Sequence, residues 1–379
     1  LCLLGSRQSP RRASRRDDGG WARLAVWIMR RPLAVAAVTF ALLLAAAVPL
    51  RSLELSPGSF EGLPSAPEAM RGLTLLEDRV GAGVVTPTQL VVQTGAAGGV
   101  RAGSVPLALD RLVERLARDP EVHVIARGRR APYVDPTGRY ARLVVAGRHG
   151  WGEPATRRLV GRIRDDYVPA ARLPVGTRAY AGGAPAQGVD FLDRTRAVFP
   201  WFAGAVLLVT YLVLLRTFRS LLLPLQEIVL NAASVAAVLG ILALAFGELE
   251  TWIPICLFAV LFGLSMDYEV FVVSRIREAR DEGHDTRAAV AAGLERTGGI
   301  VTAAALIMIA AFSGFFLGSV EGLRQLGVGL ALGVLIDAAV VRVLLLPSLI
   351  ALFGEWNWWL PRGIARLARV EPSPLRDRA

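Results

Sequence analysis

Long apolar runs alternate with short polar segments along most of the chain, and a single long polar stretch interrupts them. A run of about 20 mostly apolar residues is long enough to cross a bilayer as a helix. Membrane-spanning helices are therefore predicted over residues 24–50, 198–215, 221–246, 253–273, 300–317 and 326–353. This pattern is typical of a membrane α-helical bundle.

The first of these spans has an alternative interpretation. Arg30, Arg31 and Pro32 lie at its start, and AAAV before Pro49 resembles the cleavage region of a signal peptide. The apolar run is long for a signal peptide, and further spans follow it. We therefore favour a membrane helix.

The interrupting stretch, residues 51–196, is too polar to lie in a bilayer. Period-two alternation predicts strands in TPTQLVVQTG, VHVIARG, ARLVVAGR and TRAYAGG. Apolar residues at helical spacing predict helices in VPLALDRLVERLARD and EPATRRLVGRIRDDYV. The order β-α-β-β-α-β predicts an α+β domain of the split βαβ, or ferredoxin-like, type.

Domain boundaries follow from these elements. The chain begins with Leu1 rather than Met, and its short apolar start LCLLG suggests the remnant of a preceding helix in a longer protein. The expected parts are a polar linker with that remnant, a transmembrane helix, a porter-like α+β domain, a five-helix transmembrane bundle and a tail: residues 1–23, 24–50, 51–196, 197–353 and 354–379.

Composition agrees with a membrane protein. The chain is 53% hydrophobic with a mean hydropathy of +0.46, which is more apolar than a soluble protein of 379 residues. The formal net charge is +11, and arginine supplies every basic residue other than histidine. No basic helix is interleaved with aromatic residues, so we expect no nucleic-acid partner.

Charge in the short loops predicts the orientation. Arginines gather in the N-terminal linker, in two short loops and after the last span: Arg7, Arg11, Arg12, Arg15, Arg16, Arg216, Arg219, Arg275, Arg277, Arg280, Arg287, Arg296, Arg362, Arg366 and Arg369. Short cytoplasmic loops carry an excess of arginine and lysine. We therefore expect a multi-pass protein of the cell (plasma) membrane with both termini cytoplasmic and residues 51–196 extracytoplasmic.

Cofactor chemistry finds little support in the sequence. Cys2 and Cys256 give neither a disulfide framework nor a metal spacing. His123 and His149 lie far apart without a carboxylate cluster and are read as ordinary strand residues. The absence of a Walker-type glycine loop argues against ATP as the energy source. The proton gradient is then the plausible source, and no cofactor is expected.

Asp267 is the most informative candidate residue. It lies within an apolar span, at 1.5 Å per residue about 22 Å from Trp252 and about 12 Å from Arg275 along a helix. A charge at the bilayer centre costs about 3 kcal/mol or more, and such residues usually face a bundle interior or an aqueous path and serve ion movement. Tyr268 follows directly and can hydrogen-bond a carboxylate. Gly263 on the same face allows another helix to approach closely.

Asp337 and Arg342 form a second candidate site in the last span. Being five residues apart, they project about 140° from each other on an α-helix and make a poor intrahelical pair. We expect each to meet a neighbouring helix. Arg342 would either hold the Asp267 region in its charged state or balance Asp337. Glu269 receives no role, and Glu227 and Asn231 are interpreted as helix–helix hydrogen-bonding residues.

Long segments resemble helices of the MMPL (mycobacterial membrane protein large) family of resistance-nodulation-division transporters. They are FRSLLLPLQEIVLNAASVAAVLGIL, LFGLSMDYEVFVVSRIRE, AVAAGLERTGGIVTAAALIMIAAFSGF and RQLGVGLALGVLIDAAVVRVLLLPSLIALFGEWNWWLP. The MDYE form and the NWWLP ending resemble the C-terminal half of such a protein. The resemblance implies that Asp267 and Tyr268 form a proton-relay pair, with Asp337 and Arg342 at matching positions. Their partners would come from a missing N-terminal half or from a second copy of the chain.

The expected function is proton-motive-force-driven export of lipid-like or other hydrophobic molecules. Drug or siderophore efflux and a protein-translocation auxiliary of the same fold remain as alternatives. An intramembrane aspartyl protease using Asp267 and Asp337 is disfavoured, because the context GLSMD differs from the protease-type GxGD. We therefore expect no enzyme activity. Substrate identity and oligomeric state are not readable from the residues.

Overall fold

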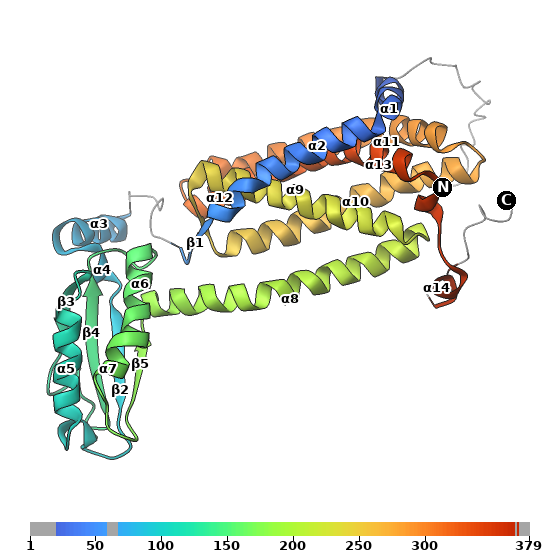
Figure 1. The fold of residues 1–379 in the computed structure, drawn as a ribbon. Coiled ribbons are helices and arrows are strands. Elements are labelled where there is room, and N and C mark those ends of the chain that lie inside the picture. The colour runs from blue at the N-terminus through green and yellow to red at the C-terminus, as the bar shows by residue number, and fades with distance from the viewer. Residues whose placement is uncertain (1–19, 59–66, 368–369, 371–379) are drawn as a thin grey trace, which may run out of the picture.

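A computed structural model describes residues 20–58, 67–367 and 370. An elongated helical bundle carries a compact α+β domain at one end (Figure 1). The expected linker and helix remnant before residue 20, and nearly all of the chain after residue 367, lie outside the described residues.

Within the described part of the chain, six segments are long and apolar enough to cross a membrane, which identifies a multi-pass membrane protein. They consist of α2 (Pro32–Ala47) with η1 (Val48–Ser52), α8 (Ala184–Phe218), α9 (Leu222–Phe246), α10 (Trp252–Asp281), α11 (Thr286–Phe316), and α12 (Glu321–Ile336), which continues through η4 (Asp337–Leu345) into α13 (Leu346–Phe353). Two short helices follow, η5 (Gly354–Trp358) and α14 (Arg362–Leu367).

The first span begins later than the apolar run predicts. Residues 20–30 form a separate amphipathic helix, α1 (Gly20–Arg30), and α2 starts at Pro32. Arg31 leaves helical geometry with φ −139° and ψ 59°, because a proline disfavours the α conformation in the residue before it. Pro32 itself is well suited to the first helical position. The expected start at residue 24 is therefore wrong, and α1 packs beside α11 instead.

Other membrane helices extend beyond their apolar runs. The helix α11 begins at Thr286, well before the apolar run at residue 300, and is capped by Asp285, whose side chain accepts a 2.7 Å hydrogen bond from the Ala288 N–H. Helical hydrogen bonding continues through turns of the helix that are made of polar residues. Hydropathy marks only the segment of each helix that is apolar enough to lie in lipid. The helix α8 likewise runs without a break from the α+β domain into the bundle (Figure 1).

The α+β domain is built on a four-stranded sheet. Its elements follow the chain as β2 (Thr88–Gln93), α5 (Val105–Ala117), β3 (Val122–Ala126), β4 (Tyr140–Gly147), α6 (Pro154–Arg162) with η3 (Ile163–Tyr167) and α7 (Val168–Ala170), and β5 (Arg178–Gly182). The strand order is β3-β4-β2-β5 and every neighbouring pair is antiparallel. Leu112, Leu159 and Leu143 join its core, so α5 and α6 pack on the sheet. Three short elements before and within it, α3 (Glu68–Val80), α4 (Ala82–Val85) and η2 (Gly99–Arg101), were not expected.

A small parallel sheet ties the domain to the bundle. The strand β1 (Glu54–Ser56) pairs with β6 (Glu248–Glu250), which lies in the turn between α9 and α10. Thr251 Oγ1 donates a 2.8 Å hydrogen bond to the Ser56 carbonyl. Arg157 of the domain donates at 2.6 Å to the Leu55 carbonyl. Strands of three residues are too short to show a repeating pattern of apolar positions, so this junction is not predictable from local sequence.

Candidate functional site

Polar side chains are buried together where α9, α10 and the last span meet. We call this set the buried polar cluster; its members are Glu227 and Asn231 of α9, Ser265 and Glu269 of α10, and Asp337 and Arg342 of η4. Apolar residues of all three helices, such as Leu230, Leu261 and Leu345, pack around it. Polar groups inside a membrane bundle cost free energy unless they are paired, so such a cluster is a candidate functional site.

Ser265 lies at the centre of the cluster. Its hydroxyl is 2.5 Å from Asn231 Oδ1 and 2.9 Å from Asp337 Oδ1, and it accepts a 2.8 Å hydrogen bond from Arg342 Nη2. Arg342 also donates to the Ser265 carbonyl. A hydroxyl has only one proton to donate. Ser265 can therefore donate either to Asn231 on α9 or to Asp337 on η4, but not to both at once.

Asp337 and Arg342 bond each other directly, contrary to the expectation from an α-helix. Arg342 Nε donates to Asp337 Oδ2 at 3.1 Å. The physical reason is that residues 337–345 form a π-helix, in which hydrogen bonds join positions five apart and residues at that spacing lie above one another. Such π segments occur often at functional sites. Of the two expected roles for Arg342, the arrangement favours balancing Asp337, while its contact with α10 meets the expectation of a neighbouring helix.

Glu227 and Glu269 are the functional candidates that the sequence analysis missed. Their side chains are almost wholly buried, at 1% and 0% exposure, and their carboxyl groups interact across α9 and α10. Among the described residues, Glu227 Oε1 and both oxygens of Glu269 have no hydrogen-bond donor. Two buried carboxylates side by side repel, so a proton on one of them stabilises the pair. The sequence signal that could have pointed to Glu269 is its position two residues after Asp267. That spacing places the two carboxyls on nearly opposite sides of the same membrane helix.

Asp267 lies outside this cluster. Its side chain is exposed on the surface of the described bundle, without a hydrogen bond or ion pair to the described residues. Gly263, one turn earlier, is exposed as well, and a Cβ added there would meet nothing within 4 Å in the described chain. Asp267 therefore faces away from the interior of the described bundle, because Ser265 and Glu269 occupy the inward face of α10.

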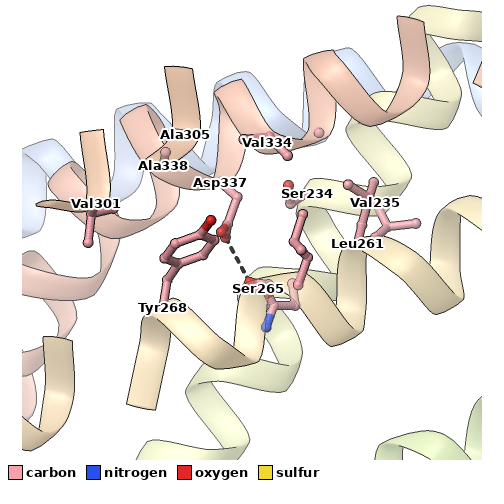
Figure 2. Close-up of a pocket in the computed structure, with 13 residues that line it drawn as sticks. Ser234, Val235, Leu261, Ser265, Tyr268, Val301, Ala305, Val334, Asp337 and Ala338 are labelled. Atoms are coloured by element: carbon pink, nitrogen blue, oxygen red, sulfur yellow. Dashed lines mark hydrogen bonds between the residues drawn. The ribbon is translucent and has the colours of Figure 1, made fainter. Parts of the chain in front are cut away.

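Tyr268 lies between Asp267 and the cluster. It points with Ser265 and Asp337 into a small pocket (Figure 2). Its hydroxyl contacts the Met308 sulfur at 3.1 Å rather than a carboxylate. The pocket holds about 20 Å³, which suffices for about one water molecule. A second cavity of the same size borders Arg342, and both touch Val301 and Ala338.

Side chains that could ligate a metal ion do not cluster in the described part of the chain. No group of three or more His, Cys, Asp or Glu side chains is arranged to hold a metal ion there. Cys256 is a free, half-buried thiol. His149 contacts the Glu121 carboxylate at 2.8 Å. The buried polar cluster of the bundle offers carboxyls, an amide, a hydroxyl and a guanidinium.

Another buried aspartate lies in the α+β domain and provides a reference. Asp119 accepts hydrogen bonds from Arg162 at 2.8 and 2.9 Å, from the Tyr167 hydroxyl at 2.7 Å and from the Glu121 N–H at 2.9 Å. Burial by itself raises the pKa of Asp119, but these bonds outweigh it and hold the pKa below its ordinary value. This carboxylate is saturated with donors, so we interpret it as structural.

Comparison with known proteins places the chain in a family. It is 32% identical to the heme uptake protein MmpL11 of Mycobacterium tuberculosis over 97% of this chain and 38% of that protein. It is 32% identical to the mycolic acid-containing lipids exporter MmpL11 of Mycolicibacterium smegmatis, over 94% and 38%. The trehalose monomycolate exporter MmpL3 of Mycobacterium tuberculosis is 29% identical over 93% and 38%.

The chain thus spans 38% of the length of these three relatives. The MMPL family model matches residues 61–375, which include the α+β domain and all the membrane helices after it. The resemblance seen in the helices around Asp267 and Asp337 is therefore confirmed over most of the sequence, and this chain belongs to the MMPL family.

Proposed function

We propose that this chain is part of a transporter that uses the proton-motive force to export lipid-like or other hydrophobic molecules. The observation that carries the proposal is the buried polar cluster, which sets three carboxyls and one guanidinium in the interior of a membrane bundle. Buried groups of this kind mark proton relays in pumps and transporters.

Proton movement would use groups on both sides of α10. Asp267 exchanges protons at the surface of the bundle, and Tyr268 lies next to it, beside the water-sized pocket that Asp337 also lines. Protonation of Asp337 would release Arg342 from its 3.1 Å contact. Arg342 would then interact with the Glu227–Glu269 pair instead, so that a change of charge becomes a movement of η4 against α9 and α10.

The exposed position of Asp267 supports a further partner. A carboxylate facing lipid costs free energy that an opposing helix can offset by supplying a polar group. Relatives of more than twice this length suggest a covalently linked half that resembles this one, while a second copy of the chain is the alternative. In either case Gly263 allows the opposing helix to approach α10 closely.

The α+β domain is proposed to be an extracytoplasmic, ferredoxin-like porter domain. Its strand order β3-β4-β2-β5 supports the fold, and arginines in the loops at the opposite end of the bundle support the orientation. The relatives named as lipid exporters favour a lipid substrate. One relative is named for heme uptake, so uptake of an amphiphile is the second candidate.

Asp267→Asn in the protein produced from its intact gene tests the proton role. Asparagine keeps the shape and polarity but exchanges no proton, so proton-coupled transport in proteoliposomes should fall to background while membrane insertion and thermal stability persist. Asp166→Asn, a change of the same kind at an exposed site of the α+β domain, is the control and should transport normally. Normal transport by Asp267→Asn would refute the proposed relay.

A further inference from the structure

The α+β domain contains a cleft that the proton pathway does not involve. Its volume is about 380 Å³, within the usual range of small-molecule sites. It is bordered by the start of α5, by the loop after β3 and by the start of β4. Ala141 in the cleft pairs with Val92 late in β2, whereas Gly182, just before α8, pairs with Gln89. The cleft therefore lies at the end of the domain away from the bundle.

The floor of the cleft is apolar. Leu109, Val134 and Leu143 line it, and all of them are buried members of the domain core. A ligand lying here would contact the side of the core itself. Burying an apolar group against this floor contributes about 25 cal/mol for each Å² removed from water.

The rim of the cleft carries an excess of positive charge. Four arginines line it, Arg101, Arg127, Arg129 and Arg142, and Asp110 is the acid among the lining residues. Asp110 is already paired with Arg127 at 2.5 Å. Within the described chain, no carboxylate lies in ion-pair distance of the other three guanidinium groups, so three positive charges remain for a ligand.

Arg142 provides a separate indication of a missing partner. Its Nε is buried and has no hydrogen-bond acceptor among the described residues. Its guanidinium lies over the Tyr133 ring, 5.8 Å from the ring centre, within reach of a cation–π interaction. Arg101, which is exposed, donates a 3.3 Å hydrogen bond to the Arg129 carbonyl. Oriented guanidinium groups bind carboxylate and phosphate through paired hydrogen bonds.

We propose that this cleft binds an amphiphilic anion. Arg101, Arg129 and Arg142 hold its carboxylate or phosphate head, and the apolar floor holds the adjoining part of its hydrocarbon body. The site is a binding site whether or not the chain transports. Its use in loading a transported lipid rests on the function proposed above.

Photolabelling of the purified protein in detergent, without a proton gradient, tests the proposal. The probe is a fatty acid that carries a diazirine on its chain, and mass spectrometry locates the adducts. We expect adducts in the peptides that contain Val134 and Leu143, suppressed by excess laurate. The uncharged dodecanol should not suppress them, because it lacks the anionic head. Equal suppression by dodecanol would overturn the role of the arginines, and full suppression by inorganic phosphate would overturn the role of the apolar floor.

Substitutions separate the two parts of the site. Arg142→Gln should reduce labelling in the cleft by about tenfold or more, the usual effect of losing a charge-assisted hydrogen bond. Ala141→Leu keeps the arginines and fills the cleft, so it should also reduce labelling. Arg118→Gln removes the same charge from an exposed arginine of the same domain and should label normally. Labelling that persists in both cleft variants, or that falls equally in Arg118→Gln, would refute the site.

Failure of this proposal and failure of the proposed function can be told apart. Asp267→Asn should bind the photolabel normally, since Asp267 lies on α10 in the bundle and not in the cleft. Normal labelling with no measurable proton-coupled transport by the native protein would refute only the transport proposal. Native transport without cleft labelling would refute only the binding site.

Discussion

Each of the two regions of this molecule contains a buried aspartate bonded to an arginine, and the two pairs differ in how fully they are satisfied. In the α+β domain, Asp119 meets Arg162 through two hydrogen bonds and receives two further donors. In the bundle, Asp337 receives one bond from Arg342 and one contact from Ser265. Nη1 of Arg342 has no acceptor among the described residues.

This difference distinguishes a structural pair from one suited to change. A carboxylate that is saturated with donors holds its charge and its position, because protonation would sacrifice several bonds at once. Asp337 has fewer bonds to lose, and Arg342 has other carboxyls near it in Glu227 and Glu269. In the bundle Arg342 thus has carboxyls near it besides its bonded partner Asp337, whereas the four bonds to Asp119 in the domain favour a single arrangement.

Among the variants of the two aspartate–arginine pairs, Asp337→Asn should have the largest effect on transport and stability. It removes the charge that balances Arg342, and loss of one partner of a buried pair typically costs about 3–5 kcal/mol. We expect proton-coupled transport to be lost and the bundle to melt at lower temperature. Transport in proteoliposomes and thermal unfolding in detergent measure the two effects.

Combining Asp337→Asn with Arg342→Gln separates function from stability. The double variant leaves no unpaired charge at this position, so stability should recover in large part while transport stays absent. Recovery of transport in the double variant would mean that the pair is structural, as we infer for Asp119 and Arg162.

Asp119→Asn should produce an intermediate effect that is confined to the α+β domain. The change replaces a carboxylate that accepts four hydrogen bonds, and we expect a loss of about 3 kcal/mol in domain stability. Hydrogen exchange of α5 and β4 measures it, and transport per folded molecule should remain. Glu114→Gln is the matched control, because its exposed pair with Arg118 contributes at most about 0.5 kcal/mol. Equal exchange in both variants would contradict the structural role of Asp119.

The response of the domain to acid should be the smallest effect. Because the folded-state pKa of Asp119 is lowered from its ordinary value of 3.8, its contribution to stability is complete above that value and is lost as the pH falls toward the folded-state pKa. Exchange rates of α5 and β4 should thus respond to Asp119 only in acid below about pH 4. In Asp119→Asn this acid-dependent part should vanish. If the exchange rates of Asp119→Asn responded to acid as those of the native protein do, the acid response would have to come from other carboxyls.

Particular elements show which features could be predicted from sequence. The strands β2 and β4 and the helix α5 were expected because their apolar residues repeat at the period of the element that they form. The break at Arg31 does not show in the hydropathy, which stays high across it, although Pro32 is a local signal for it. The strands β1 and β6 leave no pattern in three residues, and only their mutual pairing creates them.

For the candidate site too, some features were predictable from the sequence and others were not. Asp267, Tyr268, Asp337 and Arg342 were identified because charged and polar groups are rare within apolar spans. Their mutual arrangement could not be derived: the π-helix at Asp337 brings Arg342 onto its side of the helix, and the packing of α10 turns Asp267 outward and Glu269 inward. A sequence states which groups lie at a given depth, but rotation about the helix axis depends on the neighbouring helices.

The sequence by itself thus determined the kind of molecule: membrane helices, a polar α+β domain, and polar residues within the spans, where they cost free energy. Each of these depends on local hydropathy and on the period at which apolar residues repeat. The tertiary structure alone decided which polar groups meet. Glu227 lies far from Glu269 in the chain, as Ser265 does from Asp337, and these contacts exist only because α9, α10 and η4 pack together. Pairing energies depend on distance and burial in three dimensions, and no local pattern records them.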